Sequence, residues 1–119
     1  MPKLLVIDDE PAILDMMKNH FTIRGYDVVT AEDGSEGLSL LETEQPDLVL
    51  LDLKMKKMDG DQFLKEVRER KSQAKVIVIT GYQDPSFKDR MQKFGVDAFF
   101  EKPASITELQ RKVYEIVGG

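Results

Sequence analysis

The stretch Leu4-Leu5-Val6-Ile7-Asp8-Asp9-Glu10-Pro11 decides the fold of this chain. Its four apolar residues do not alternate with polar ones, which is typical of a strand covered on both faces and therefore of a parallel sheet. Two aspartates follow the strand, and a proline then occupies a first-turn position of a helix, where its missing N–H is not needed. The stretch predicts a strand, an acidic turn and a helix, in that order.

The same alternation of strand and helix continues along the chain. Uninterrupted apolar runs recur at 48–51 and 76–79, with weaker strand candidates at 28–29 and 98–100. The helix signals between them are a segment from about 11 to 24, an N-cap pattern at Asp33, an apolar stripe at Phe63, Leu64 and Val67, a start at Asp84-Pro85, and a capping box from Ser105 to Glu108. Five strands alternating with five helices predict a doubly wound α/β fold of three layers.

Some polar and sulfur-containing residues have a simple structural interpretation. Met16 and Met17 continue the apolar spacing of the first helix, and we interpret both as core residues. His20 falls on the same stripe, where packing is a commoner role for a histidine than catalysis or metal binding. Glu66 and Arg70 are spaced to pair on the exposed side of the third helix.

Composition narrows the classes of function. The 119 residues fit one domain, 1–119, and 17 basic against 22 acidic residues give a net charge of −5, which opposes binding to nucleic acid and anionic membranes. The absence of cysteine excludes disulfides, thiol nucleophiles and cysteine-type zinc sites. With His20 as the single histidine, a histidine-rich metal cluster is excluded and a Ser-His-Asp triad is not expected. No apolar stretch is long enough for a signal peptide or a membrane span, so we expect a cytoplasmic protein.

Reactive side chains follow the apolar runs. In an open parallel sheet ligands bind beyond the carboxyl ends of the strands, where this chain places Asp8, Asp9, Asp52, Thr80 and Lys102. Crowded carboxylates call for a cation, and oxygen ligands with room for water favour Mg²⁺. The hydroxyl and the ammonium can hold a phosphoryl group, and one carboxylate can act as the nucleophile. The alternative interpretation is a solvated, helix-capping turn at Asp8 and Asp9, with an incidental threonine and lysine elsewhere.

The chain resembles the response-regulator receiver domains of two-component signalling. The resemblance extends from Lys3 to about Val117. It rests on Val6-Ile7-Asp8-Asp9-Glu10-Pro11, Leu50-Leu51-Asp52, Met58-Asp59-Gly60, Ile79-Thr80-Gly81 and Lys102-Pro103. It implies a flavodoxin-like, five-stranded parallel sheet in the order 2-1-3-4-5, an order that the strand pattern also suggests.

The resemblance also assigns the acceptor and the metal ligands. Asp52 is then the phosphoacceptor, which receives its phosphoryl group from the phosphohistidine of a histidine kinase. Asp9, Asp52 and the backbone carbonyl of Lys54 are the implied Mg²⁺ ligands, while Asp8 acts mainly through metal-bound water. The domain would catalyse only its own phosphorylation and dephosphorylation.

The switch and the partners follow from the same resemblance. Lys102 is expected to pair with Asp52 or the phosphoryl group, and Thr80 is expected to move onto a phosphoryl oxygen. Phe99 takes the place of the family's rotating aromatic, which often carries a hydroxyl. The implied partners are a sensor histidine kinase or phosphotransfer protein, and a downstream effector protein or fused output domain. Direct binding of this domain to nucleic acid or membrane is not expected.

Two other functions remain open at this point. One is a receiver-like interaction domain that is no longer regulated by phosphate. This alternative stays open because Phe99 lacks the hydroxyl that the family's rotating aromatic often carries. The other is an aspartyl-nucleophile phosphatase similar to the haloacid dehalogenase family. Such an enzyme needs a second aspartate two residues after the nucleophile, and this chain has Lys54 there.

Overall fold

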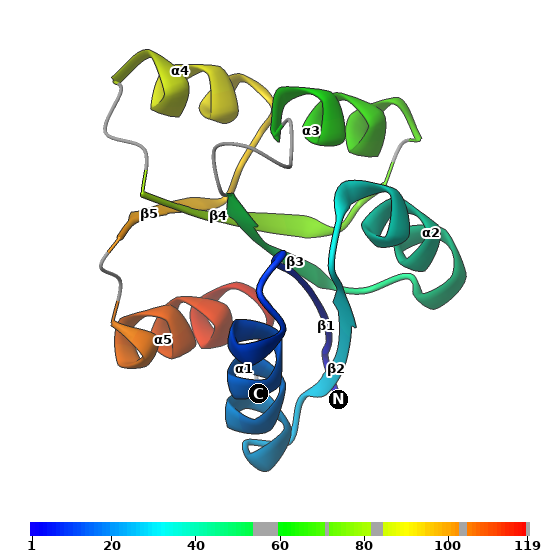
Figure 1. The fold of residues 1–119 in the computed structure, drawn as a ribbon, viewed down its shortest axis with the longest axis vertical. Coiled ribbons are helices and arrows are strands. Elements are labelled where there is room, and N and C mark those ends of the chain that lie inside the picture. The colour runs from blue at the N-terminus through cyan, green and yellow to red at the C-terminus, as the bar shows by residue number, and fades with distance from the viewer. Residues whose placement is uncertain (54–59, 71, 82–84, 103–104, 119) are drawn as a thin grey trace.

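The computed structural model describes residues 1–53, 60–70, 72–81, 85–102 and 105–118. The elements in chain order are β1 (Lys3–Ile7), α1 (Pro11–Ile23), β2 (Asp27–Ala31), α2 (Gly34–Glu44), β3 (Leu48–Leu53), α3 (Gly60–Glu69), β4 (Lys75–Thr80), α4 (Pro85–Lys93), β5 (Ala98–Glu101) and α5 (Ile106–Val117). The strands form one parallel sheet in the order β2-β1-β3-β4-β5 (Figure 1). The predicted fold class and strand order are therefore confirmed.

Helices cover both faces of the sheet. In Figure 1, α1 and α5 lie on one face, and α2, α3 and α4 lie on the other. Because successive side chains of a strand point to opposite faces, each apolar strand supplies both layers. In β1, Leu4 and Val6 pack with the layer of α1 and α5, whereas Leu5 and Ile7 pack with the opposite layer. This explains why the strands are apolar runs and do not alternate.

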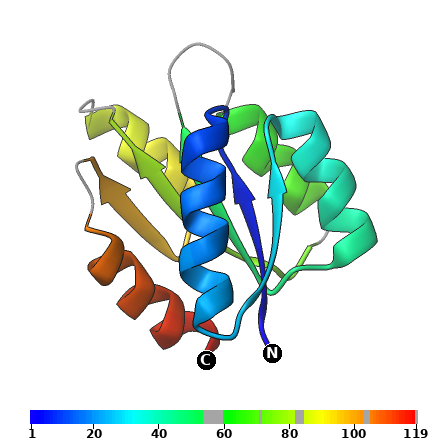
Figure 2. The same cartoon turned by 60° about the horizontal axis from the view of Figure 1, so that its bottom comes forward.

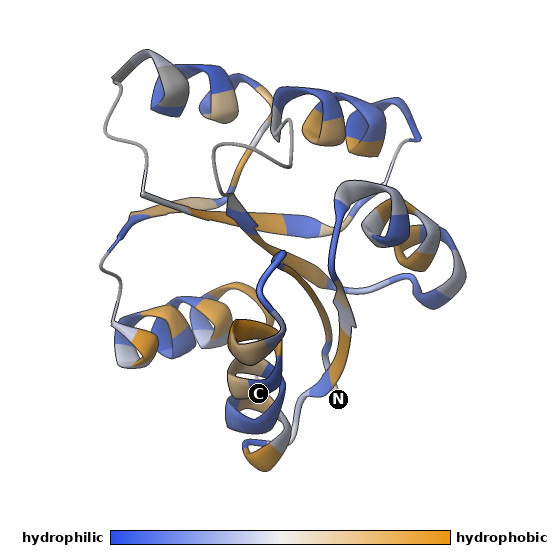
Figure 3. Ribbon diagram, viewed as in Figure 1, coloured by the Kyte–Doolittle hydropathy of each residue, from blue (hydrophilic) through white to orange (hydrophobic). Residues whose placement is uncertain are grey.

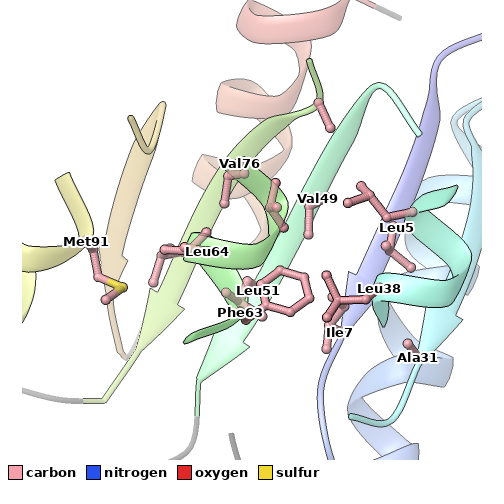
Figure 4. Packing of buried hydrophobic residues seen from close by; sticks show 14 residues of the cluster. Leu5, Ile7, Ala31, Leu38, Val49, Leu51, Phe63, Leu64, Val76 and Met91 are labelled. Atoms are coloured by element: carbon pink, nitrogen blue, oxygen red, sulfur yellow. The ribbon is translucent and has the colours of Figure 1, made fainter. Parts of the chain in front are cut away.

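The core beneath α2 to α4 is shown in Figure 4. Residues of three adjacent strands meet Phe63 and Leu64 of α3, while Leu38 of α2 and Met91 of α4 flank them. Figure 3 shows that hydrophobic residues concentrate in the strands and that hydrophilic residues cover much of the helices. Gly37 of α2 allows a close approach to the sheet, since a Cβ there would meet Ile7 Cδ1 at 2.5 Å.

The helix ends agree with the sequence signals. Pro11 occupies the first turn of α1, and Gly25 follows that helix with a φ of 95°, a conformation that favours glycine. Asp33 caps α2 by accepting a hydrogen bond from the Glu36 N–H at 2.8 Å. Ser105 caps α5 in the same way. The predictions made from Asp84 and Lys54 concern segments outside the described part of the structure.

Two of the structural interpretations were wrong, and one was confirmed. Met17 is buried, but Met16 is 44% exposed, because a helix turns by about 100° per residue and Met16 lies past the edge of the core stripe. The interpretation of His20 as a packing residue is confirmed, since its half-buried ring packs edge-to-face against Phe21 with the ring centroids 5.1 Å apart, and its Nε2 also hydrogen-bonds Gln110 Oε1 of α5 at 2.9 Å. Arg70 forms its ion pair with Glu42 of α2 rather than within its own helix.

All five strands point the same way, so their carboxyl ends lie at one edge of the sheet (Figure 2). The chain's two marked ends lie near the opposite, amino edge in the same view. Within the described residues, no helix has the length and apolar character needed to cross a membrane.

Candidate functional site at the carboxyl edge of the sheet

The strand register brings the acidic residues together. Ile7 of β1 is paired with Leu51 of β3, so Asp8 and Asp52, one residue further along, occupy neighbouring positions. The Asp8 N–H donates to the carbonyl of Ala31 at 3.1 Å, which continues the pairing of β1 with β2. Two aspartates that lie 44 positions apart in the sequence are thereby fixed side by side at the sheet edge.

The fourth and fifth strands add a hydroxyl and an ammonium group. Thr80 ends β4, and its backbone carbonyl accepts a hydrogen bond from the Lys102 N–H at 2.8 Å. This bond holds the residue after β5 beside the end of β4. The sequence-predicted residues Asp8, Asp52, Thr80 and Lys102 are thus gathered at one edge, with half-buried Asp9 next in the chain.

Burial distinguishes this edge from the rest of the molecule. Asp8 and Thr80 are 0% exposed and Asp52 is 4% exposed. Among the described residues, these three are the only buried polar or charged ones. Burying a charged carboxylate is costly unless other charges and hydrogen bonds compensate for it. A fold that buries two neighbouring aspartates at one edge therefore concentrates an electrostatic cost there.

Lys102 supplies part of the compensation. Its Nζ lies 2.8 Å from Asp52 Oδ1, and its side chain is about one-third exposed against 4% for Asp52. Asp52 Oδ1 is itself buried and, among the described residues, forms no hydrogen bond in addition to this ion pair. Because the Lys102 side chain is partly exposed, its ammonium group has room to adjust to a change of charge on this carboxylate.

Asp8 has a structural task as well as its place in the acidic group. Its Oδ1 accepts a hydrogen bond from the Glu10 N–H at 2.9 Å, which shapes the turn between β1 and α1. The interpretation of Asp8 as a turn residue is thus correct, but the predicted solvated cap is wrong, because Asp8 is 0% exposed and Glu10 is the N-cap residue of α1, without a side-chain capping bond. This turn role does not compete with the site interpretation, because the same side chain is fully buried beside Asp52.

The two faces of the sheet divide the site residues. Asp52 continues the side of β3 that faces α1 and α5, whereas Thr80 continues the Val76 and Val78 side of β4, which faces α3 and α4. Phe99 of β5 pairs with Val78 and packs in the same layer as those valines. Thr80 and Phe99 therefore share one layer, and a movement of one can reach the other without crossing the sheet.

One further contact of Phe99 has no signal in the sequence. Lys88 of α4 places its Nζ 5.8 Å from the centre of the Phe99 ring, within the range of a cation–π interaction. Nothing local marks this lysine, since the contact joins residues of different elements. It could only have been found from the packing of α4 against β5.

The described residues do not by themselves complete a cation site. No group of three acidic or histidine side chains within the described ranges is arranged to hold a metal ion, and the predicted carbonyl ligand of Lys54 falls outside those ranges. Mg²⁺ commonly binds through one or two carboxylates and retains several waters. Buried Asp52 with half-buried Asp9 fits that donor chemistry, and an ion there would offset the cost of the buried charges.

Comparisons with known proteins agree with this geometry. Residues 4–114 match the response regulator receiver domain. The chain is 36% identical over 115 residues to the alkaline phosphatase synthesis transcriptional regulatory protein PhoP of Bacillus subtilis, covering 97% of this chain and 48% of that protein. It is 37% identical over 117 residues to the DNA-binding regulator RpaA of Synechocystis, again covering 48% of the relative. The chain spans about half the length of these relatives.

Solved structures show the same fold. A CheY-like receiver domain protein from Methanospirillum hungatei superposes with a TM-score of 0.89 at 32% identity, covering 97% of this chain and 92% of that one. The response regulator TrrA of Thermotoga maritima, solved in complex with Mg²⁺-BeF, gives a TM-score of 0.83 at 32% identity, covering 98% and 100% of the two chains.

Proposed function

Because the chain belongs to the response regulator receiver domain family, we propose that residues 1–119 form one receiver domain, a signalling switch that accepts a phosphoryl group on Asp52. The observation that carries the proposal is the burial of Asp8, Asp52 and Thr80 at one sheet edge, with Lys102 Nζ 2.8 Å from Asp52. The proposed donor is the phosphohistidine of a sensor histidine kinase or phosphotransfer protein.

The proposed transfer is a displacement at phosphorus. A carboxylate oxygen of Asp52 attacks, the N–P bond of the phosphohistidine breaks, and the imidazole leaves with the bonding electron pair. Lys102 follows the charge from the carboxylate to the phosphoryl oxygens, which favours the transition state only as far as the interaction strengthens there. Mg²⁺ would be held by Asp9, Asp52 and the backbone carbonyl of Lys54. Asp8 would act through a water molecule on the ion. When bound, this ion would neutralise charge on the transferring oxygens.

The proposed switch uses the layer shared by Thr80 and Phe99. The Thr80 hydroxyl donates to a phosphoryl oxygen, and Phe99 moves into the space that the threonine leaves. Because Phe99 has no hydroxyl, packing alone stabilises its inward position. The changed surface then binds a downstream effector protein or a fused output domain. No direct role in nucleic-acid binding is proposed for this domain, and its catalysis is limited to its own acyl phosphate.

The acceptor is tested with acetyl phosphate and Mg²⁺. We expect intact-mass spectrometry to show one added phosphoryl group that is labile to hydroxylamine, and Asp52→Asn to abolish it. Asp47→Asn is the matched control, because Asp47 is an exposed aspartate directly before the same strand. A stable adduct on the Asp52→Asn protein would contradict the assignment. Failure of the wild type to accept phosphate would favour the phosphate-independent interaction domain, and sustained turnover of phosphate esters would favour the phosphatase.

The switch is tested by NMR with beryllium fluoride as a phosphoryl mimic. Chemical-shift changes should extend from the acidic residues to Thr80, Phe99 and Lys102. In the Thr80→Ala protein, the chemical-shift changes should be confined to residues around Asp8 and Asp52. Changes confined to that region in the wild type would reject the coupling while leaving the acceptor assignment intact.

A further inference from the structure

The contact between Lys88 of α4 and Phe99 of β5 joins a surface helix to the proposed switch. The Lys88 Nζ lies 5.8 Å from the centre of the Phe99 ring, a distance at which an ammonium group is attracted to the face of an aromatic ring. Lys88 is exposed, whereas Phe99 is half-buried and packs against the core beneath α2 to α4. The ring therefore contacts apolar core residues and, nearer the surface, a cation.

The positive charge of Lys88 is available to the ring. Within the ranges that the structure describes, no carboxylate forms an ion pair with Lys88. Arg90, two residues further along the same helix, differs in this respect, because its Nε lies 3.1 Å from Asp61 Oδ2 of α3. Since Lys88 is exposed, water competes with the ring for the ammonium group, and the attraction is at the weak end of the range for cation–π contacts.

The helix that carries Lys88 is tied to its neighbour α3 at two points. Arg68 of α3 donates from Nε to the Phe94 carbonyl at 2.6 Å and from Nη2 to the Gly95 carbonyl at 3.0 Å, directly after the end of α4. The ion pair between Arg90 and Asp61 is the second connection. Figure 1 shows α3 and α4 side by side. A movement of the Phe99 ring alone would therefore change its contact with Lys88, because α4 is held in place by α3.

The position of Phe99 depends on contacts of its ring, because phenylalanine has no hydroxyl that could form a hydrogen bond. Thr80 shares the layer of Phe99 and is 0% exposed, whereas Lys88 is exposed. A ring that moves toward Thr80 therefore leaves the position in which its face meets the ammonium group. Apolar contacts can be made again in the new position, but this contact with a cation is lost.

We propose that Lys88 is a positioning residue of the switch, whose ammonium group stabilises the observed position of Phe99 and thereby opposes the phosphorylated state. The inference rests on the proposed function, because it uses the movement of Phe99 that accompanies phosphorylation. A contact shifts an equilibrium between two states only when its strength differs between them, and the contact of Lys88 with the ring meets this condition. Lys88 thus lowers the fraction of molecules whose Phe99 is already turned inward.

The proposal is tested with Mg²⁺ and beryllium fluoride, whose apparent affinity is measured by NMR titration. The apparent affinity of a ligand scales with the fraction of protein in the binding-competent state. Removing a weak cation–π contact by Lys88→Met should therefore tighten binding of the mimic about two- to fivefold. Lys88→Arg keeps a cation that stacks on aromatic rings and should bind like the wild type. Lys93→Met is the matched control, because it removes the same charge from another exposed position of α4.

A second background isolates the aromatic ring. Phe99→Leu removes the ring but keeps an apolar side chain, and in this background Lys88→Met should leave the affinity for the mimic unchanged. The ring also predicts an upfield ring-current shift of the Lys88 ε-methylene protons in the absence of the mimic, and Phe99→Leu should abolish that shift. This second measurement does not depend on phosphoryl chemistry. All variants are first compared by thermal unfolding, so that a folding defect is recognised.

The outcomes separate this inference from the proposed function. Equal or weaker binding of the mimic by the Lys88→Met protein would overturn the role of Lys88 alone, provided that the wild type binds. The same would follow if Lys88→Arg or Lys93→Met tightened binding equally, or if the effect of Lys88→Met persisted without the Phe99 ring. A wild type that does not bind beryllium fluoride would overturn the proposed function, and this inference with it.

Discussion

The charged side chains at the two edges of the sheet differ in how far they are buried. At the amino edge, Lys3 Nζ lies 3.1 Å from Glu44 Oε1 and 3.8 Å from Asp27 Oδ2, and the Lys3 N–H donates to Asp47 Oδ2. These side chains are partly exposed, so their ion pairs and hydrogen bonds lie at the protein surface. At the carboxyl edge, two neighbouring aspartates are buried and the described partner of Asp52 is a single lysine.

This difference separates charged pairs that stabilise the fold from charged residues that belong to the candidate site. The hydrogen bond from Lys3 to Glu44 raises the pKa of Lys3, as expected for an ammonium beside carboxylates, and the pairs help to close the bottom of the sheet. The charges around Asp52 are removed from water at a cost, which the ion pair with Lys102 offsets in part. A fold keeps such a cost where the charges serve a reaction, and the following predictions test that view.

The largest effect should come from Mg²⁺. If the carboxyl edge holds the ion, saturating it at about a hundred times its dissociation constant should raise the free energy of unfolding by about 2.7 kcal/mol. Urea unfolding with MgCl₂ and with NaCl of equal ionic strength measures this. Asp9→Asn should lose most of the gain, while Asp27→Asn at the amino edge should keep it. Equal stabilisation of all three proteins would place the ion elsewhere.

The next-largest effect should come from replacing the lysine at each edge, Lys102 at the carboxyl edge and Lys3 at the amino edge. Lys102→Met leaves a buried carboxylate without its ammonium partner, and we expect a loss of about 2 kcal/mol, below the usual cost of breaking a buried pair because Lys102 is one-third exposed. Lys3→Met at the amino edge removes solvated pairs and should cost less than Lys102→Met does.

A double-mutant cycle makes this comparison sharper. In the Asp52→Asn background, Lys102→Met should cost much less, because no buried charge is left alone. An unchanged cost in that background would mean that Lys102 contributes by packing, and the electrostatic contrast between the two edges would not hold.

Aspartate-to-asparagine changes should have opposite signs at the two edges. Asp8→Asn keeps the shape that accepts the Glu10 N–H but removes one of two neighbouring buried charges, so it should stabilise the apo protein by about 1 kcal/mol. Asp47→Asn weakens an exposed bond to the Lys3 N–H and should destabilise it by about 0.5 kcal/mol. Chemical unfolding without divalent cations measures both, and destabilisation by Asp8→Asn would contradict the prediction.

The sequence predicted the grouping at the carboxyl edge better than the surroundings of the helices, and the reason is geometric. Parallel strands that end in polar residues must bring those residues to one edge, so Asp8, Asp52, Thr80 and Lys102 could be grouped before the structure was known. The pairing of Arg70 with Glu42 joins residues of different helices, for which no local spacing exists. The exposure of Met16 depends on where the core stripe of α1 ends, which helical periodicity defines only to within about one residue.

The smallest effect is a pH dependence at the amino edge, where Tyr26 directly precedes β2. Burial raises the pKa of the Tyr26 phenol, and the Tyr114 phenolate adds to the shift. The unfolded phenol loses its proton near pH 10, before the folded one does, so the folded state holds more protons there and stability falls as pH rises through that range.

Tyr26→Phe also removes the bond to the Gly118 carbonyl, which should cost about 1 kcal/mol at neutral pH. The difference in unfolding free energy between the wild type and Tyr26→Phe should therefore shrink above about pH 10, while lysine titrations cancel in the subtraction. Tyr114→Phe, at an exposed position, should leave the neutral-pH stability nearly unchanged. A difference between wild type and Tyr26→Phe that stays constant from neutral to alkaline pH would show that the phenol titrates equally in both states.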